Sequence, residues 1–122
     1  MIQLQRKWFR HPIDALKAVW KAQSKIAEYG EPMLWLKAGL HKGPCIVVNL
    51  NNRLDYFGST VNIAARLPNF SQGGELILSE AFYNDPEIRD FLLQNTPSSA
   101  LQCFTGDVKG FDEPFTMWKV RI

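Results

Sequence analysis

The chain is poor in cysteine and histidine, the residue types that mark metal centres and disulfide frameworks. Its 122 residues include two cysteines and two histidines. His11 and His41 stand far apart in the sequence, so they do not form the closely spaced ligand set of a structural zinc site. Cys45 and Cys103 occur without a secretory signal, which favours reduced thiols in a cytoplasmic protein over a disulfide.

The chain also lacks long apolar runs and a dominant charge. No run approaches the roughly 18 apolar residues that span a membrane, and residues 1–11 are polar and basic without the apolar core of a signal peptide. There are 14 basic and 12 acidic residues, and a net charge of +2 is too balanced to indicate nucleic-acid binding. With 46% apolar and 21% charged residues, the composition is typical of one soluble globular domain.

One amphipathic helix is predicted over residues 12–29. Pro12 suits the first helical position, where its missing N–H costs no hydrogen bond. Side chains suited to one buried face recur at three- and four-residue spacing, at Leu16, Val19, Trp20, Gln23, Ile26 and Ala27. Gly30 suits the C-terminal cap, and Pro32 prevents continuation. We expect this helix to pack on a sheet.

Strands are predicted from short apolar runs bounded by turn residues. They cover residues 34–40, 45–50, 54–57, 76–78, 101–104 and 115–120. A polar loop is predicted over 49–53, and the last two strands are expected to pair across the turn at 109–114. Residues 1–11 have no clear period and are interpreted as an arm or a strand remnant.

Two further helices are predicted from their caps and breakers. Ser59 or Thr60 is expected to cap a short helix that Pro68 ends, because the residue before a proline avoids the helical region. Ser79 is expected to cap a helix over residues 80–93, with Pro86 marking a kink or a break inside it. Trp8, Trp20, Trp35 and Trp118 are expected in the core or at an interface.

Chemistry is concentrated in residues 53–66, which read RLDYFGSTVNIAAR. Asp55 precedes a turn at Gly58, and the helix that follows carries Asn62 and Arg66 four positions apart. That spacing puts both side chains on one helix face, with Cβ atoms roughly 5–6 Å apart. An amide beside a guanidinium, near the positive end of a helix, suits a phosphate ester. Asp55 could accept a hydrogen bond from an amino group of a base, so the stretch predicts a nucleotide site.

The same stretch closely resembles a segment of class III nucleotidyl cyclases, which convert ATP or GTP to the cyclic monophosphate. Three other segments are similar to the same family in matching order: residues 36–45 (LKAGLHKGPC), 73–80 (GGELILSE) and 108–114 (VKGFDEP). The similarity extends over roughly residues 9–122. One such motif is weak, whereas four in order and spacing are a strong signal.

The resemblance implies a role for each candidate residue. Asp55 would select the base, and an acid suits adenine because a carboxylate accepts from its amino group. Asn62 would orient the ribose, and Arg66 would neutralise charge on the α-phosphate. Lys109 would hold the terminal phosphates. The alternatives are a solvated loop aspartate, a surface asparagine, a salt-bridged arginine and a solvated turn lysine. His41 is common at its position in the family, but we expect it only to pack or hydrogen-bond near the turn.

The family's domain is longer and carries two metal-binding aspartates and an adenine-reading lysine in its first half. This chain resembles the C-terminal part, as in a truncated gene or a degraded copy. It is therefore expected to contribute no metal ligand, although Mg²⁺ or Mn²⁺ is expected for the intact domain. The isolated chain is expected to be inactive.

The resemblance implies an α+β fold with an antiparallel-rich sheet and packed helices, as in the ferredoxin-like core of cyclases. The expected function is that of an adenylate cyclase domain that makes cyclic AMP and pyrophosphate from ATP for intracellular signalling. Two alternatives are a module that binds nucleotide or pairs with a cyclase without catalysis, and a purely structural interaction domain. Exposed strand edges and the family's shared active sites both indicate a dimer or pairing with a cyclase domain. Sequence upstream of Met1 would discriminate among these.

Overall fold

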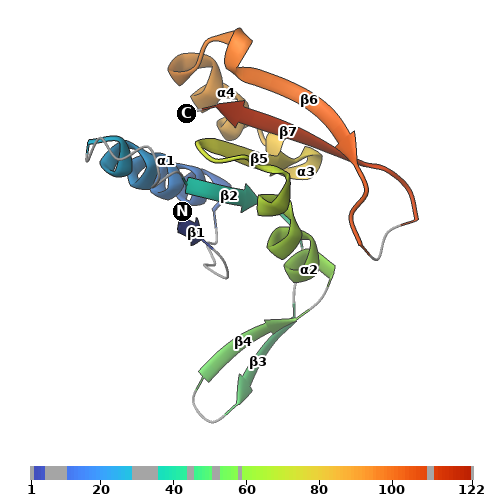
Figure 1. The fold of residues 1–122 in the computed structure, drawn as a ribbon. Coiled ribbons are helices and arrows are strands. Elements are labelled where there is room, and N and C mark those ends of the chain that lie inside the picture. Colours follow the sequence, from blue (N-terminus) through green and yellow to red (C-terminus); the bar gives the residue numbers. More distant parts are fainter. Residues whose placement is uncertain are drawn as a thin grey trace.

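The computed structural model describes residues 2–4, 11–28, 36–43, 46–50, 53–57, 59–109 and 112–121. Within them the chain is α+β: a five-stranded mixed sheet carries helices on both faces, and a two-stranded hairpin stands apart (Figure 1). The predicted fold class is therefore confirmed.

β5 (Glu75–Ser79) is the central strand of the five-stranded sheet. The other four strands are β1 (Ile2–Leu4), β2 (Leu36–Leu40), β6 (Leu101–Gly106) and β7 (Phe115–Arg121), in the order β1-β2-β5-β7-β6. The β1–β2 and β2–β5 pairs are parallel, and the β5–β7 and β6–β7 pairs are antiparallel. Leu76, Ile77 and Leu78 are fully buried because both neighbours and both faces of β5 are covered.

One face of the sheet is covered by α1 (Pro12–Glu28), α3 (Glu80–Tyr83) and α4 (Pro86–Asn95). The core between these helices and the sheet contains Ala15, Leu16, Val19, Ala38, Leu76, Leu78, Phe82, Ile88, Leu92 and Val120. Trp20 meets Phe91 edge to face, with ring centroids 5.3 Å apart, which joins α1 to α4. The amphipathic pattern of residues 12–29 therefore has the expected result: one face of α1 is buried on the sheet.

The opposite face is covered by α2 (Ser59–Arg66) and the 3₁₀-helix η1 (Leu67–Phe70). Ile63 and Leu67 pack there on Ile77 and Met117. The backbones approach closely, because a Cβ on Gly39 of β2 would lie 2.8 Å from Cδ of Pro68. A glycine at this position therefore lets η1 rest on the sheet.

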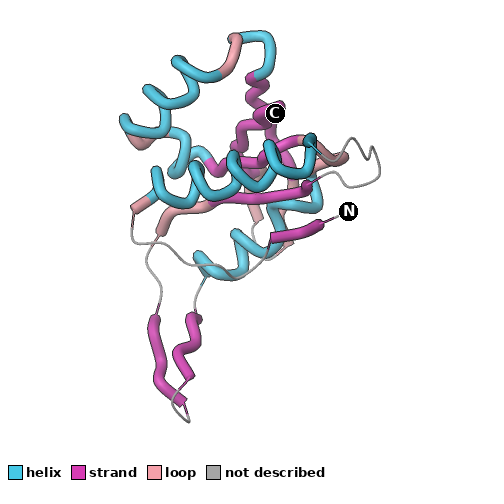
Figure 2. The backbone as a smooth tube through the Cα atoms, turned by 90° about the vertical axis from the view of Figure 1, so that its left-hand side faces the viewer, coloured by secondary structure: helices cyan, strands magenta, loops and turns pink. Residues whose placement is uncertain are grey.

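β3 (Ile46–Leu50) and β4 (Arg53–Phe57) form an antiparallel hairpin in which Val48 lies opposite Asp55. The hairpin extends away from the main sheet, as two views at right angles show (Figures 1 and 2). The predicted strand over 45–50 is confirmed for Ile46–Leu50, so the predicted loop over 49–53 is wrong where it overlapped that strand and at Arg53, which pairs with Leu50. At Asn49, cross-strand pairing has outweighed the low strand propensity of asparagine.

Most of the predicted boundaries are confirmed. The first helix is described over Pro12–Glu28, as predicted, and Tyr29, Gly30 and Pro32 lie outside the described residues. α2 ends before Pro68 as predicted, but the chain continues as η1 because Pro68 is tolerated in a first helical turn. Of residues 1–11, Ile2–Leu4 form a strand, which agrees with a strand remnant.

Residues 80–93 form two helices, so the break alternative at Pro86 is correct. Ser79 caps the first helix, accepting from the backbone N–H of Phe82 at 3.2 Å. Asp85 caps the second, accepting from the N–H of Glu87 at 3.0 Å. The predicted cap at Ser59 or Thr60 concerns side chains outside the described part.

Trp20 and Trp118 are half-buried against the first core, as expected; Trp8 and Trp35 lie outside the described residues. Among the described helices, none combines the length and the apolar character needed to cross a membrane.

Candidate nucleotide site

Asn62 and Arg66 lie on one face of α2, as their spacing predicts. The side chain of Asn62 is exposed and that of Arg66 is half-buried. Arg66 Nη1 donates to the backbone oxygen of Asn62 at 3.4 Å, a long and therefore weak hydrogen bond. No carboxylate pairs with Arg66 among the described residues, so most of its five N–H donors are available to a ligand.

The position of Arg66 on the helix corrects one part of the prediction. Arg66 is the last residue of α2, and Asn62 is the fourth. The positive end of the helix dipole is at Ser59, and the negative end is at Arg66. The helix therefore stabilises the guanidinium itself, but it adds no attraction for an anion bound there. Any phosphate at this site would depend on the charge and hydrogen bonds of Arg66.

Asp55 lies in β4, which leads into α2 through Gly58. Its backbone pairs with Val48, which fixes its place in the hairpin. Its side chain and Gly58 lie outside the described part of the chain. The structure therefore places Asp55 on the element before the Asn62–Arg66 pair, and the assignment of its carboxylate to a base remains a prediction.

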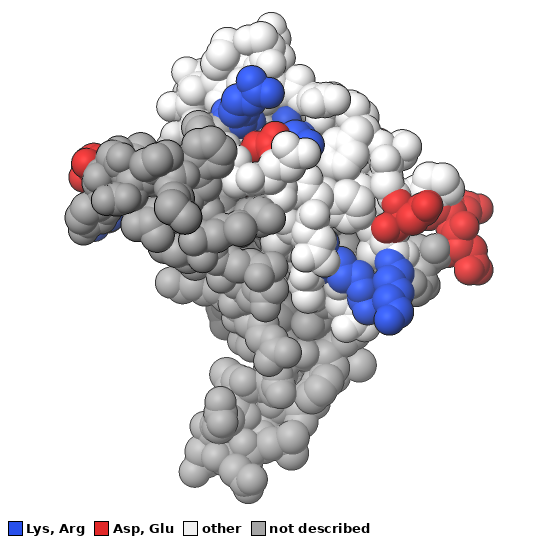
Figure 3. Space-filling view, in the orientation of Figure 1, with Lys and Arg blue, Asp and Glu red and all other residues white. Residues whose placement is uncertain are grey.

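Lys109 follows β6 in the connection to β7 and is exposed. No hydrogen bond or ion pair joins it to Asn62 or Arg66 among the described residues. The same connection carries three exposed acids, Asp107, Asp112 and Glu113. Figure 3 shows basic side chains between α2 and this acidic connection. The nearby carboxylates oppose phosphate binding at Lys109, so its proposed role is less favoured electrostatically than that of Arg66.

His41 is held at the C-terminal end of β2. Its Nδ1 lies 2.7 Å from Oγ of Ser79, and its ring meets Phe115 with centroids 6.2 Å apart. Burial lowers the pKa of His41 below 6.5, because desolvation disfavours the imidazolium. The expectation that His41 packs and hydrogen-bonds near the turn is confirmed.

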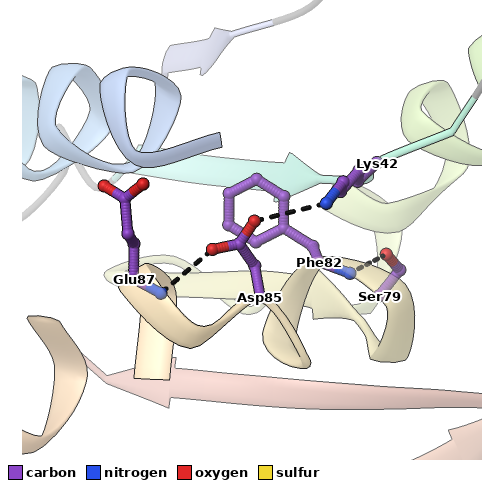
Figure 4. A network of polar contacts seen from close by, with 5 residues as sticks. All are labelled: Lys42, Ser79, Phe82, Asp85 and Glu87. Carbon is purple, nitrogen blue, oxygen red and sulfur yellow. Dashed lines mark hydrogen bonds and ion pairs between the residues drawn. The ribbon is translucent and has the colours of Figure 1, made fainter. Parts of the chain in front are cut away.

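A second polar contact lies beside the first, and sequence reasoning missed it. Lys42 Nζ lies 3.3 Å from Oδ2 of Asp85, the residue that also caps α4 (Figure 4). The carboxylate of Asp85 therefore uses one oxygen for the helix and the other for the β2 terminus. The cap could have been inferred from an aspartate before Pro86. The ion pair could not, because its residues are 43 positions apart.

The described residues contain no group of three or more histidine, cysteine, aspartate or glutamate side chains placed to hold a metal ion. These residues therefore do not by themselves fit a two-metal centre.

A mixed sheet with helices on both faces, and an Asn–Arg pair on a short helix after a hairpin, are the features that a nucleotidyl cyclase type of domain would need for this site. The chain belongs to the adenylate and guanylate cyclase catalytic domain family, whose model matches residues 13–112. The resemblance predicted from four segments is thereby confirmed.

Proteins of similar sequence or structure are cyclases as well. A receptor-type adenylate cyclase of Trypanosoma congolense is 28% identical over an alignment of 91 residues, which covers 72% of this chain and 12% of that protein. An adenylate cyclase structure from Trypanosoma brucei, in its monomeric state, gives a TM-score of 0.54 at 26% identity, covering 66% of this chain and 34% of that one.

The adenylate/guanylate cyclase/hydrolase of Silicibacter pomeroyi has the same fold, with a TM-score of 0.63 at 22% identity. It covers 93% of this chain and 64% of that one. The chain thus spans less than two thirds of the length of each of these three relatives.

Proposed function

We propose that this chain is the part of an adenylate cyclase domain that binds ATP through its ribose and phosphates. The observation that carries the proposal is the pair on α2, an exposed Asn62 and an Arg66 without a carboxylate partner among the described residues, held together at one helix end. Asn62 can exchange hydrogen bonds with ribose hydroxyls, and Arg66 can bind phosphate oxygens in a bidentate manner.

The proposed reaction forms a bond between the ribose 3′-oxygen and the α-phosphorus and breaks the bond to the β-phosphate. Pyrophosphate leaves, and the 3′-hydroxyl loses its proton. Charge builds on the α-phosphate as the attack proceeds, and the guanidinium of Arg66 would stabilise it. Such preorganised charge stabilisation contributes several kcal/mol in related phosphoryl transfers.

The preference for ATP is part of the proposal and rests on Asp55. A carboxylate accepts a hydrogen bond from the exocyclic amino group of adenine, whereas guanine presents an acceptor oxygen at that edge. The trypanosome relative named a receptor-type adenylate cyclase agrees with this choice.

Other parts of the active site would come from outside the described residues. Mg²⁺ or Mn²⁺, held by carboxylates elsewhere in an intact domain, would supply Lewis-acid chemistry to the phosphates. We also propose that the domain works in the cytoplasm, where ATP is abundant, and that it forms a homodimer or pairs with a cyclase domain. If ATP binds without turnover in such an assembly, the function is that of a nucleotide-binding module.

Nucleotide binding by the purified chain tests the proposal directly. ATP and GTP are titrated by calorimetry into the unaltered chain, an Arg66→Met variant and an Arg121→Met control. Arg121 is exposed at the end of β7, so its loss removes the same charge at another site. We expect ATP to bind more tightly than GTP, and Arg66→Met to weaken ATP binding by about tenfold. Equal losses in both variants, or no binding of ATP, would contradict the proposal.

A further inference from the structure

β6 is an edge strand with an open side. Among the described residues it pairs with β7 and with no other strand, and Figure 1 shows it at the outer margin of the sheet. Gln102, Cys103 and Thr105 are exposed. The strand reads LQCFTG and has no proline and no charged residue, so it lacks two devices that native edge strands use against pairing. No other described strand takes up its outer backbone groups, so they suit pairing with a further strand.

A groove lies where α3 and α4 meet β6 and β7. Its volume is about 330 Å³, and it is lined by Tyr83, Arg89, Leu92, Leu93, Leu101 and Trp118. Leu93 is 75% exposed and is the one large apolar side chain so exposed within the described part of the chain. An exposed apolar side chain beside an open strand edge is typical of an interaction surface.

The groove has a rigid wall and a positive charge. Tyr83 and Trp118 stack with ring centroids 3.9 Å apart and an interplanar angle of 14°. The guanidinium of Arg89 lies 5.3 Å from the centroid of Tyr83, and its Nη2 donates to Oδ1 of Asn84 at 2.6 Å. Both partners are uncharged, and no carboxylate pairs with Arg89 among the described residues. The groove therefore suits a partner that brings a negative charge.

We propose that this surface binds a second copy of the chain through antiparallel pairing of the two β6 strands, with Phe104 opposite the second copy's Phe104. This register puts residues of the same sheet face opposite one another, as a continuous sheet requires. The two half-buried Phe104 rings come together on the face away from the groove, where cross-strand aromatic pairs stabilise a sheet.

The same register supplies the missing negative charge. Asp107 directly follows β6, is exposed, and makes no ion pair among the described residues. It comes opposite Leu101 of the other copy, and Leu101 lines the groove together with Arg89. Twofold symmetry repeats this contact, so the dimer has two Asp107–Arg89 pairs. This complementarity within one sequence favours a second copy over an unrelated extended peptide.

The surface is separate from the nucleotide site, because the groove and α2 are on opposite faces of the sheet. This edge-to-edge interface is therefore different from a pairing in which two domains share an active site, and the choice of a second copy rests on the complementary charges of Arg89 and Asp107 rather than on the proposed function. Loss of nucleotide binding would leave it standing, and loss of association would leave the nucleotide site standing.

Charge reversal tests the interface by analytical ultracentrifugation. Arg89→Glu and Asp107→Arg each turn two ion pairs into repulsions, so each is expected to raise the dimer dissociation constant about tenfold. The double variant reverses both charges and is expected to return to within about threefold of the unaltered chain. Arg121→Glu at the end of β7 and Glu28→Arg at the end of α1 change the net charge equally and are expected to leave association unchanged.

Cross-linking tests the register independently of affinity. With Cys45 replaced by serine, Thr105→Cys puts a thiol opposite Cys103 of the other copy, at roughly the 4.5–5.5 Å Cβ separation of opposed residues. Mild oxidation should yield a covalent dimer, whereas a Gln102→Cys control faces the other side of the sheet and should not link to Cys103. Circular dichroism confirms that each variant is folded.

Three results would overturn the proposal: a chain that is monomeric at millimolar concentration, single charge reversals that associate as tightly as their controls, or a double variant no tighter than either single one. Cross-linking that is equal in the Thr105→Cys and Gln102→Cys variants would overturn the register.

Discussion

Arg66 Nη1 lies 3.4 Å from the backbone oxygen of Asn62, one helical turn earlier in α2. This contact turns the guanidinium back along the helix, in the direction that helical side chains normally take. The guanidinium is thereby held near the side of α2 that carries Asn62. Since the hydrogen bond is long, a phosphate oxygen could replace the carbonyl oxygen at little cost.

The first prediction concerns the α2 pair in a protein that carries this segment within a complete cyclase domain. Arg66→Ala and Asn62→Ala should each lower kcat about 100-fold or more, a larger effect than the about tenfold weakening of ATP binding expected when Arg66 is replaced. The reason is that both side chains are assigned to charge and geometry that develop in the transition state. Steady-state kinetics measure kcat and KM for ATP separately in each variant, with Arg121→Ala as the control. Near-normal kcat in both variants would remove the pair from the mechanism.

The second prediction concerns the chain of 122 residues by itself. It should form no cyclic AMP from ATP with Mg²⁺ or Mn²⁺, because two-metal chemistry needs carboxylates that hold both ions. The described residues contain no such group, and none is expected from the four matching segments. Product is measured by chromatography against a protein-free blank. Turnover above the blank that disappears in Arg66→Ala would show the prediction wrong.

The third prediction concerns the base. In a complete domain, Asp55→Cys should reduce the preference for ATP over GTP by roughly ten- to a hundredfold, the value of one lost polar contact. The carboxylate accepts from adenine and repels the guanine oxygen, whereas a thiol is a weak donor and acceptor. The measurement is the ratio of kcat/KM for the two nucleotides, with Asp112→Cys in the exposed β6–β7 connection as control. An unchanged ratio would mean that Asp55 does not read the base.

The fourth prediction follows from the buried imidazole of His41. Its pKa in the folded protein is below 6.5, because burial penalises the charged form. Between the two pKa values the unfolded chain takes up a proton that the folded chain does not, so stability is full above about pH 6.5 and falls as the pH drops below it. His41→Gln removes this titration and should flatten the decrease.

Urea unfolding at about pH 7.5 and about pH 5.5 measures the difference in unfolding free energy. His11→Gln, at an exposed position, serves as the control and should behave like the unaltered chain. A decrease of the same size in His41→Gln would assign the pH dependence to other groups.

The fifth prediction concerns the contact that seats η1 on the sheet. Gly39→Ala should lower the free energy of unfolding by about 1–3 kcal/mol, because the new Cβ overlaps Leu67 and lies 2.8 Å from Cδ of Pro68. Gly43→Ala, at an exposed position after β2, is the control and should change stability by no more than about 0.5 kcal/mol. Equal effects of the two substitutions would mean that the contact relaxes freely.

Local patterns predicted most of the elements because each depends on residues a few positions apart. The helical spacing of Leu16, Val19 and Gln23 specified the buried face of α1, and Ser79 specified the start of α3. Local reasoning was divided where pairing decided the outcome, as at Asn49 and Leu50, which it assigned both to a strand and to a loop, and it missed the pairing of Arg53 with Leu50.

For the candidate site too, some features were predicted from the sequence and others were seen only in the structure. The sequence by itself determined that Asn62 and Arg66 share a helix face, since four residues make about one turn. The stop at Pro68 was also predicted, and the structure shows that Arg66 is the last residue of α2, so that the helix dipole does not assist anion binding there.

The sequence thus determined which residues form helices, strands and caps, and which carry the family's motifs. Tertiary structure alone decided the contacts of His41 with Ser79 and of Lys42 with Asp85, which join residues 38 and 43 positions apart. It also decided that β6 lies at the edge, beside Arg89 and Leu93. Periodicity and capping act within one or two turns of chain, whereas strand order and the groove between elements depend on how the whole core packs.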